Sequence, residues 1–315
     1  MRPMKIPGRL KVIWHVLKQS GSDFLDDKVL KLSAALSYYT IFSIAPMLII
    51  IIFLCDIFLG KESIEGSVYS QIRSLVGNDA TLQIKSMITN ATLSNDVSWA
   101  TIFGGVMLVV GATGVFAEIQ DSINFIWKLK AKPKKSGIVK LLLNRLLSFS
   151  LVVSMGFILL VSLALNGLME VMNHRLLAVF PEVEYVAVYA ANLVITFLVI
   201  TTLFAIIFKV LPDAKIRWKD VLVGAIATAT LFMIGKFAIG FYLGASKISS
   251  AYGAAGSIVI ILLWVYYSAA ILYFGAVFTR VWVQYFGSRI YPNEYAIWMQ
   301  EVSVPEENSE HTGEG

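Results

Sequence analysis

The polar residues that could take part in chemistry lie inside or beside long apolar stretches of this sequence. In LSAALSYYTIFSIAPMLIIII, which begins at residue 32, Ser33, Ser37 and Thr40 are spaced four and three residues apart. A helix would place their hydroxyls on one face, and Pro46, which cannot donate a hydrogen bond to the carbonyl of Phe42, would bend that helix. Such a stripe either bonds neighbouring helices or borders a cavity open to water or lipid headgroups. The candidates for a substrate path in this stretch are Ser33, Ser37, Tyr38, Tyr39, Thr40 and Pro46.

A second polar group follows the apolar run 97–117, in GATGVFAEIQDSINFIWKLK. Glu118 and Asp121 are three residues apart, so the helical turns that hold them present a polar face. A carboxylate at a membrane boundary is costly unless it is paired or hydrated, and Arg145, at the start of a later apolar run, is the expected partner. The group therefore forms either a structural salt bridge or a polar vestibule for substrate or protons. Its candidate residues are Glu118, Gln120, Asp121, Asn124 and Arg145.

Lys236 is the third candidate, because it lies inside the apolar run 221–246. A lysine at that depth costs about 2.5 to 3.5 kcal/mol on insertion scales. Its alkyl stem either carries the ammonium group to the membrane surface or directs it into a cavity, where it would meet a phosphate or a carboxylate. Gly240 and Gly244 of the same run have the G-x-x-x-G spacing that is typical of close helix packing.

Membrane-spanning helices would have to position all of these side chains. Apolar residues make up 57% of the 315 residues and charged residues only 15%, whereas soluble domains carry about 25% charged residues. An apolar run of about 20 residues is long enough to cross the hydrocarbon core as a helix. The sequence therefore predicts an all-α, polytopic membrane protein with six transmembrane helices. The predicted spans are 32–55, 97–117, 146–169, 185–208, 221–246 and 256–279.

The positions of Lys and Arg predict the orientation of these spans. Basic residues are concentrated in segments 1–31, 128–145 and 209–219 and are sparse in the intervening loops. Such segments stay on the cytoplasmic side, so both termini are expected to be cytoplasmic. We expect the basic loops to contact anionic lipid headgroups, and no nucleic acid, since the net charge of +5 follows from this topology. The first span is too long for a cleaved signal peptide, so it is expected to be retained.

Three segments outside the spans have their own pattern. Short amphipathic helices are predicted outside the bilayer, one of them on the inner surface, where Leu10, Ile13, Trp14 and Leu17 share one helical face. Segment 60–96 is expected to form an outer-face amphipathic cap, and the acidic tail 287–315 to be disordered. Residues 1–286 would then be a single six-helix membrane domain.

Cysteine and histidine usage bears on metal and enzyme chemistry. Cys55 is the single cysteine, and His15, His174 and His311 are far apart in the sequence. No His, Cys and carboxylate group in the sequence has the spacing of metal ligands, and there is no phosphate-binding loop or nucleophile elbow. We expect no metal, no cofactor and no enzymatic activity.

Three motifs in order, AALSYYTIFSIAPML, GVFAEIQDSINFIW and AYGAAGSIVIILLWVYYSAAILYFGA, resemble the YihY/BrkB family of bacterial inner-membrane proteins over roughly 20–285. The resemblance implies a six-helix, multi-pass protein of the inner membrane without an established reaction. Where many members have an acidic residue after the Gly-Ala pair, this chain has Val277. The residues that match the family pattern are Tyr38, Tyr39, Ser43, Pro46, Gln120, Asn124, Trp127, Tyr252, Gly253, Trp264, Tyr266, Gly275 and Ala276.

The resemblance and the polar residues above lead to three hypotheses on function. Members have carried a ribonuclease BN label, but a metal-dependent ribonuclease needs clustered His and Asp ligands, which this sequence lacks. Other members are associated with envelope integrity and lipid export. We therefore expect a transporter or flippase-like handler of a lipid or another amphiphilic envelope component, whose path is lined by the hydroxyl stripe, the polar turn at 118–124 and Lys236. The alternative is a non-transporting scaffold for envelope assembly, and an oligomer is compatible with either.

Overall fold

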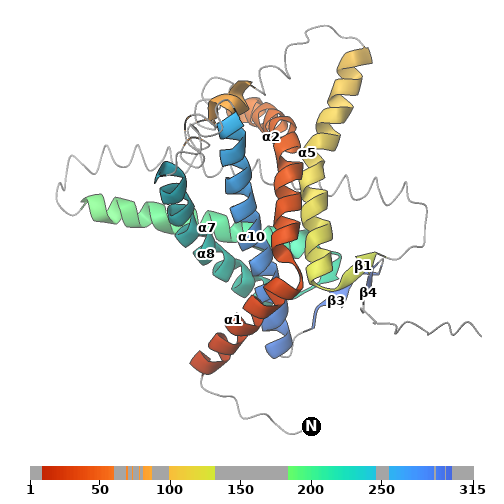
Figure 1. Ribbon diagram of the computed structural model, residues 1–315, viewed down its shortest axis with the longest axis vertical. Coiled ribbons are helices and arrows are strands. Elements are labelled where there is room, and N and C mark those ends of the chain that lie inside the picture. Colours follow the sequence, from red (N-terminus) through yellow and green to blue (C-terminus); the bar gives the residue numbers. More distant parts are fainter. Residues whose placement is uncertain are drawn as a thin grey trace, which may run out of the picture.

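The computed structural model describes residues 9–59, 69, 73, 78, 81–86, 99–131, 184–245, 255–286, 289–294 and 296–299. Its long elements are helices (Figure 1). In chain order they are α1 (Arg9–Asp26), α2 (Val29–Leu59), α5 (Trp99–Ile126), α7 (Glu184–Val210), α8 (Trp218–Ala245) and α10 (Gly256–Tyr285). The strands are β1 (Leu129–Ala131), β2 (Ala214–Lys215), β3 (Tyr291–Pro292) and β4 (Ala296–Trp298).

Five of the six predicted spans coincide with helices, namely α2, α5, α7, α8 and α10. Three of these contain described stretches that are long and apolar enough to cross a membrane, at Leu193–Val210, Trp218–Ile239 and Gly256–Tyr285. The predicted span 146–169 lies outside the described residues, as does Arg145. Of the predicted cap 60–96, residues 69, 73, 78 and 81–86 are described, and they are helical.

The apolar surface of α8 fits a lipid environment. Ile234 and Phe237 are exposed on this helix, and Phe241 exposes 81% of its surface. In water such a face would be unfavourable, because burial of apolar area is the main force that drives folding. In a bilayer the hydrocarbon chains are the solvent for such a face, so no partner helix is needed to cover it.

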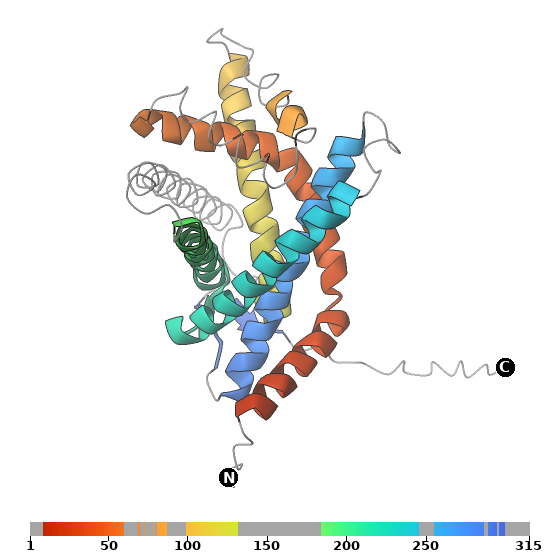
Figure 2. The ribbon, with the colours of Figure 1, turned by 90° about the vertical axis from the view of Figure 1, so that its left-hand side faces the viewer.

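The helix α2 bends strongly along its length (Figure 2). Pro46 is the single proline of this helix, and it leaves the carbonyl of Phe42 without its helical donor. Sharp bends in helices are almost always found at such positions, and the bend was predicted from the sequence for this reason.

Helix α10 lies at the centre of the described structure (Figures 1 and 2). It packs against α1, α2, α5 and α8. Among the described helices, α2 with α5 and α7 with α8 form two pairs that meet through α10. The buried part of α10 is concentrated in its second half, from Leu272 to Val283.

Two glycine and threonine pairs fit α8 closely against α10. Gly224 lies against Thr279, and Gly275 lies against Thr228. Each threonine hydroxyl donates to the carbonyl of the glycine four residues earlier in its own helix, Thr228 to Gly224 and Thr279 to Gly275, both at 2.7 Å. The two antiparallel helices therefore present the same Gly-x-x-x-Thr unit to each other, and we call this contact the Gly–Thr exchange.

The short strands lie together at one end of the bundle, which we call the strand end. There β1 pairs antiparallel with β4, and β2 with β3. Helices α5, α7 and α10 end at the strand end, and α2 and α8 begin there.

The predicted disordered tail 287–315 is wrong for the described part of 289–299, because β3 and β4 pair with strands that follow α7 and α5. The tail beyond residue 299 lies outside the described residues. The all-α prediction also needs a small correction: the described part of the chain is predominantly helical but contains two sheets of two strands each. These strands are only two or three residues long, too short for an alternating pattern to mark them in the sequence.

Helix α1 confirms that the predicted N-terminal amphipathic segment is helical. Its Val12 and Val16 are buried, and α1 packs against α10. The apolar face predicted from the sequence is a different one: Ile13 and Leu17 are exposed, and Trp14 exposes 70% of its surface. That exposed face is available to a membrane surface, and its contact with lipid stays a prediction.

Candidate functional site

The predicted hydroxyl stripe forms on α2, but its hydroxyls are bonded within their own helix. Ser33 donates to the carbonyl of Val29 at 2.9 Å, Ser37 to that of Ser33 at 2.9 Å, and Thr40 to that of Leu36 at 2.8 Å. Ser33 and Ser37 are buried. This back-bonding pattern is a common way for Ser and Thr to satisfy their donors in a helix. The stripe therefore satisfies its donors without a neighbouring helix or water.

The two tyrosines of the same stretch lie on the outside of the described structure. Tyr38 and Tyr39 are exposed, and their rings contact each other, while Tyr38 also contacts the ring of Phe42. Pro46 belongs to the bent helix, and its side chain lies outside the described ones.

Gln120 and Asn124 meet a carboxylate that the sequence did not single out. Gln120 Nε2 donates to Asp213 Oδ1 at 3.0 Å, and Asn124 Nδ2 donates to Asp213 Oδ2 at 3.1 Å. The backbone N–H of Asp213 donates back to Asn124 Oδ1 at 2.8 Å, and the carbonyl of Asp213 accepts from the N–H of Asn293 at 3.0 Å. All three side chains are buried, and Asp213 exposes only 5% of its surface. The polar face at 118–124 thus joins α5 to the loop after α7 and to the β3–β4 turn.

The two carboxylates of that face have other surroundings. Glu118 Oε1 accepts a long hydrogen bond of 3.4 Å from Ser122 on the same helix, and Asp121 is exposed. Because Arg145 lies outside the described residues, the predicted salt bridge between it and these carboxylates stays a prediction.

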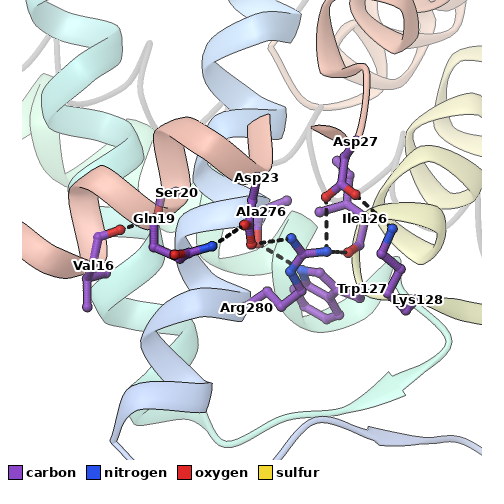
Figure 3. Close-up of polar contacts among 10 residues, drawn as sticks. All are labelled: Val16, Gln19, Ser20, Asp23, Asp27, Ile126, Trp127, Lys128, Ala276 and Arg280. Atoms are coloured by element: carbon purple, nitrogen blue, oxygen red, sulfur yellow. Dashed lines mark hydrogen bonds and ion pairs between the residues drawn. The ribbon is translucent and has the colours of Figure 1, made fainter. Parts of the chain in front are cut away.

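A network of four charged side chains connects α1, α5 and α10 at the strand end, and we call it the charge network (Figure 3). Arg280 Nη2 lies 2.6 Å from Asp23 Oδ2, and Arg280 Nη1 lies 3.0 Å from Asp27 Oδ2. Lys128 Nζ lies 2.7 Å from Asp27 Oδ1. Removing one member of a buried ion pair typically costs about 3 to 5 kcal/mol, because its partner is left uncompensated.

Neighbouring polar groups orient the charge network. Arg280 Nη1 also donates to the carbonyl of Ile126 in the last turn of α5, a group that has no partner within the helix. Gln19 Nε2 donates to Asp23 Oδ1 at 2.6 Å, and the indole N–H of Trp127 donates to the carbonyl of Ala276 at 3.0 Å. The network therefore holds the end of α5 against α10, and α1 lies beside this contact (Figure 3).

Two lysines with left-handed backbones lie just beyond helix ends. Lys28 follows α1 with a φ of 53°, and Lys128 follows α5 with a φ of 57°. A residue with a Cβ is strained in this region by about 1 to 2 kcal/mol. At Lys128 this conformation accompanies the ion pair with Asp27, whereas Lys28 is exposed and makes no ion pair among the described residues.

A cavity of about 350 Å³ adjoins the charge network between the ends of α5 and α10 and the segment of β3 and β4. The residues that give it its character are Trp127, Lys128, Arg280, Arg289, Tyr291 and Trp298. Sequence reasoning missed Asp23, Asp27 and Arg289, and it treated Arg280 only as the end of the last span. The one signal in the sequence is Arg280 itself, a basic residue that follows the apolar residues of the last motif.

Lys236 lies on α8 and is half-buried. It makes no ion pair with any described residue. It does not line the cavity and does not belong to the charge network. The described contacts thus bring Gln120 and Asn124 to Asp213 but do not bring Lys236 or the hydroxyl stripe to them. No group of three or more His, Cys, Asp or Glu side chains in the described part of the chain is placed to hold a metal ion.

Comparison with known proteins gives a consistent set of matches. The model of the virulence factor BrkB family matches residues 21–294. A UPF0761 membrane protein of Saccharophagus degradans is 27% identical over 262 residues, which cover 82% of this chain and 57% of that protein. A UPF0761 membrane protein of Stenotrophomonas maltophilia is 26% identical over 269 residues, covering 81% and 56%.

A third relative, from Rhodospirillum centenum, is 24% identical over 280 residues, covering 87% of this chain and 59% of that protein. The chain therefore spans a little over half the length of the curated relatives that it matches. No solved structure matches it.

Proposed function

The chain belongs to the virulence factor BrkB family and is an integral membrane protein, and from that premise we propose that it resides in the bacterial inner membrane and moves a lipid or another amphiphilic component of the envelope, as a transporter or flippase-like protein. The observation that carries this proposal is the charge network at the strand end. Ionisable residues inside a membrane bundle are costly, and they commonly mark a substrate path or a moving contact. The proposal includes no catalytic step, and it assigns no ribonuclease activity.

The charge network is placed where a moving contact would be needed. Helices α2 and α5 pack on α10, α8 packs on it together with its partner α7, and α1 crosses its end. Alternating access in membrane transporters is largely the rocking of one helix bundle against another. Ion pairs that hold α1 and the end of α5 to α10 would close the strand end in one state and separate in the other.

The orientation that we propose places the strand end in the cytoplasm. The basic residues of the described strand end include Lys128, Lys130, Lys209, Lys215, Arg217 and Lys219. Lys and Arg near membrane spans stay on the cytoplasmic side. Helix α1 and strands β3 and β4 lie at the same end, which supports the prediction that both terminal regions are cytoplasmic.

Lipid movement in vesicles tests the proposal. The full chain would be reconstituted into vesicles of phosphatidylethanolamine and phosphatidylglycerol that contain a fluorescent phospholipid, and an impermeant reductant would quench the outer leaflet. We expect the inner-leaflet signal to decay faster than in vesicles without protein, and Asp27→Asn to change this rate because it breaks two ion pairs of the network. Arg217→Gln is the control, since it removes a basic side chain at the same end that pairs with Asp220 and lies outside the charge network. A wild-type rate equal to that of empty vesicles would refute transport of this lipid.

A scaffold without transport is the second candidate, and a specific observation favours it. The hydroxyls of the stripe are bonded within α2, and Lys236 is not brought near them. The test is the accessibility of position 236: Lys236→Cys, in a Cys55→Ser background, would be treated with an impermeant thiol reagent in intact cells and in inverted vesicles. Labelling from either side indicates an aqueous cavity and favours transport, whereas protection from both sides favours the scaffold.

A further inference from the structure

The cavity at the strand end has the composition of a site for an anion. Its walls include Lys128, Arg280 and Arg289, and no carboxylate is among the described residues that line it. The two aspartates that pair with Arg280 and Lys128, Asp23 in α1 and Asp27 just after it, are not part of the lining. The cavity is thus bordered by three cationic side chains, and the carboxylates that pair with two of them, Lys128 and Arg280, lie outside it.

Residues that line this cavity keep donors without acceptors after the ion pairs are formed. Arg280 is 7% exposed, and its Nε is buried without a hydrogen-bond acceptor among the described residues. The ammonium group of Lys128 has three N–H donors, and Asp27 is the one carboxylate among the described residues with which it forms an ion pair. Arg289 is exposed and makes no ion pair in the described part of the chain. A buried N–H without an acceptor is unfavourable by about 1 to 3 kcal/mol, so a ligand that accepts from Arg280 Nε would remove this penalty.

Direct donors, more than net charge, would hold the anion. Two of the three cations are balanced by Asp23 and Asp27, which leaves one positive charge in excess. The C-terminal ends of α5 and α10 add partial negative charge nearby, although Arg280 already donates to the carbonyl of Ile126. The guanidinium group presents several N–H donors in one plane, which suits the oxygens of a phosphate.

The remaining walls of the cavity are aromatic. Trp298 is 52% exposed and Tyr291 is 54% exposed, and both line the cavity beside the buried Trp127. Trp and Tyr are enriched at the depth of the lipid headgroups, where one part of the ring system meets an apolar region and the other meets water. A ligand that fits this cavity therefore combines an anionic group with an apolar part.

We propose that this cavity binds a phosphate-bearing anionic group at headgroup depth, with Arg289 and Arg280 as its donors. The phosphate belongs either to an anionic phospholipid or to a free phosphate, and the experiment below separates these sources. The site does not depend on transport: a protein that binds this group without moving lipid would still have it.

Binding to the detergent-solubilised full chain tests the site. Tryptophan fluorescence would be titrated with short-chain phosphatidylglycerol, with phosphatidylcholine of the same chains and with inorganic phosphate. We expect phosphatidylglycerol to bind and Arg289→Gln to weaken its affinity at least about tenfold, the effect of losing one charge-assisted hydrogen bond. Arg289→Lys should retain part of the affinity. Lys219→Gln, at an exposed lysine of the same end that does not line the cavity, should retain all of it.

Each result decides for or against the site. Saturable binding of inorganic phosphate that is lost in Arg289→Gln supports the site and identifies free phosphate as its ligand. Equal affinity for phosphatidylcholine and phosphatidylglycerol overturns the proposal, as does unchanged affinity in Arg289→Gln or the absence of binding by all three probes. Absence of lipid movement in vesicles would remove the transport proposal alone, because it leaves these affinities unchanged.

Discussion

A methyl group added at Gly224 should separate α8 from α10. In the Gly–Thr exchange a Cβ on Gly224 would lie 3.0 Å from Thr279 Cβ and 3.3 Å from its Cγ2, and closer still to its Oγ1. The threonine is buried and its hydroxyl is bonded to Gly275. It therefore cannot rotate away without losing that hydrogen bond, and the two helices have to move apart.

The magnitude follows from two opposing effects. Alanine is the better helix former by about 0.5 to 1 kcal/mol, which would stabilise α8. Overpacking of a close contact typically costs about 1 to 3 kcal/mol, and a forced contact with a buried threonine belongs at the upper end. We expect Gly224→Ala to lower the free energy of unfolding by about 1 to 2 kcal/mol.

The assay is thermal unfolding of the detergent-solubilised full chain, with Gly21→Ala as the matched control. Gly21 lies in α1, and a Cβ added there meets no atom within 4 Å, so this variant should be neutral or slightly stabilising. In a double-mutant cycle, Thr279→Ala should recover part of the loss in Gly224→Ala, with a coupling of at least about 1 kcal/mol. Equal unfolding temperatures for Gly224→Ala and Gly21→Ala, or strict additivity in the cycle, would refute the close approach of the two helices.

Four further substitutions test other contacts by the same unfolding measurement. Lys28→Gly should stabilise the protein by about 1 kcal/mol, because glycine adopts the left-handed backbone without strain. Lys128→Gly should destabilise it, because this change removes an ion pair of the charge network. A change in stability of the same sign in both variants would contradict this reasoning. Asp213→Asn should lower the free energy of unfolding by about 1 to 3 kcal/mol, because the new amide N–H₂ would face the side-chain donor of either Gln120 or Asn124. An unchanged stability would argue against the buried carboxylate. Ser37→Ala should change stability by less than about 0.5 kcal/mol, because its hydroxyl bonds only within α2, and a larger loss would indicate a partner on another helix.

The long helices were predictable because hydropathy is a local property of the chain. Five of the predicted spans coincide with helices, although α10 continues to Tyr285, beyond the predicted end at residue 279. The charge of Arg280 is the reason why the predicted span ends at residue 279. In the structure its charge is paired with Asp23 and Asp27 inside the bundle, so the helix passes through it without interruption.

The partners of the polar residues were not predictable in the same way. Gln120 and Asn124 could be placed on one helical face from their spacing alone, but their acceptor, Asp213, is 93 and 89 residues away in the sequence. Nothing local marks Asp213, which follows a proline in a short connection. For the hydroxyl stripe the sequence predicts the shared helical face correctly. Its hydroxyls bond within their own helix, however, so the described contacts point to no function for them.

The charge network has a consequence for the order of synthesis. Asp23 and Arg280 are 257 residues apart, and chains are made at about 5 to 20 residues per second. On the order of 13 to 50 seconds therefore pass between the synthesis of Asp23 and the synthesis of Arg280. During that interval the carboxylates of Asp23 and Asp27 have to stay in water or on another partner at the membrane surface, and α1 cannot take its final position. Strands β1 and β2 pair with residues that are synthesised later still, so among the contacts of the described residues those of the strand end are the last to form during biogenesis.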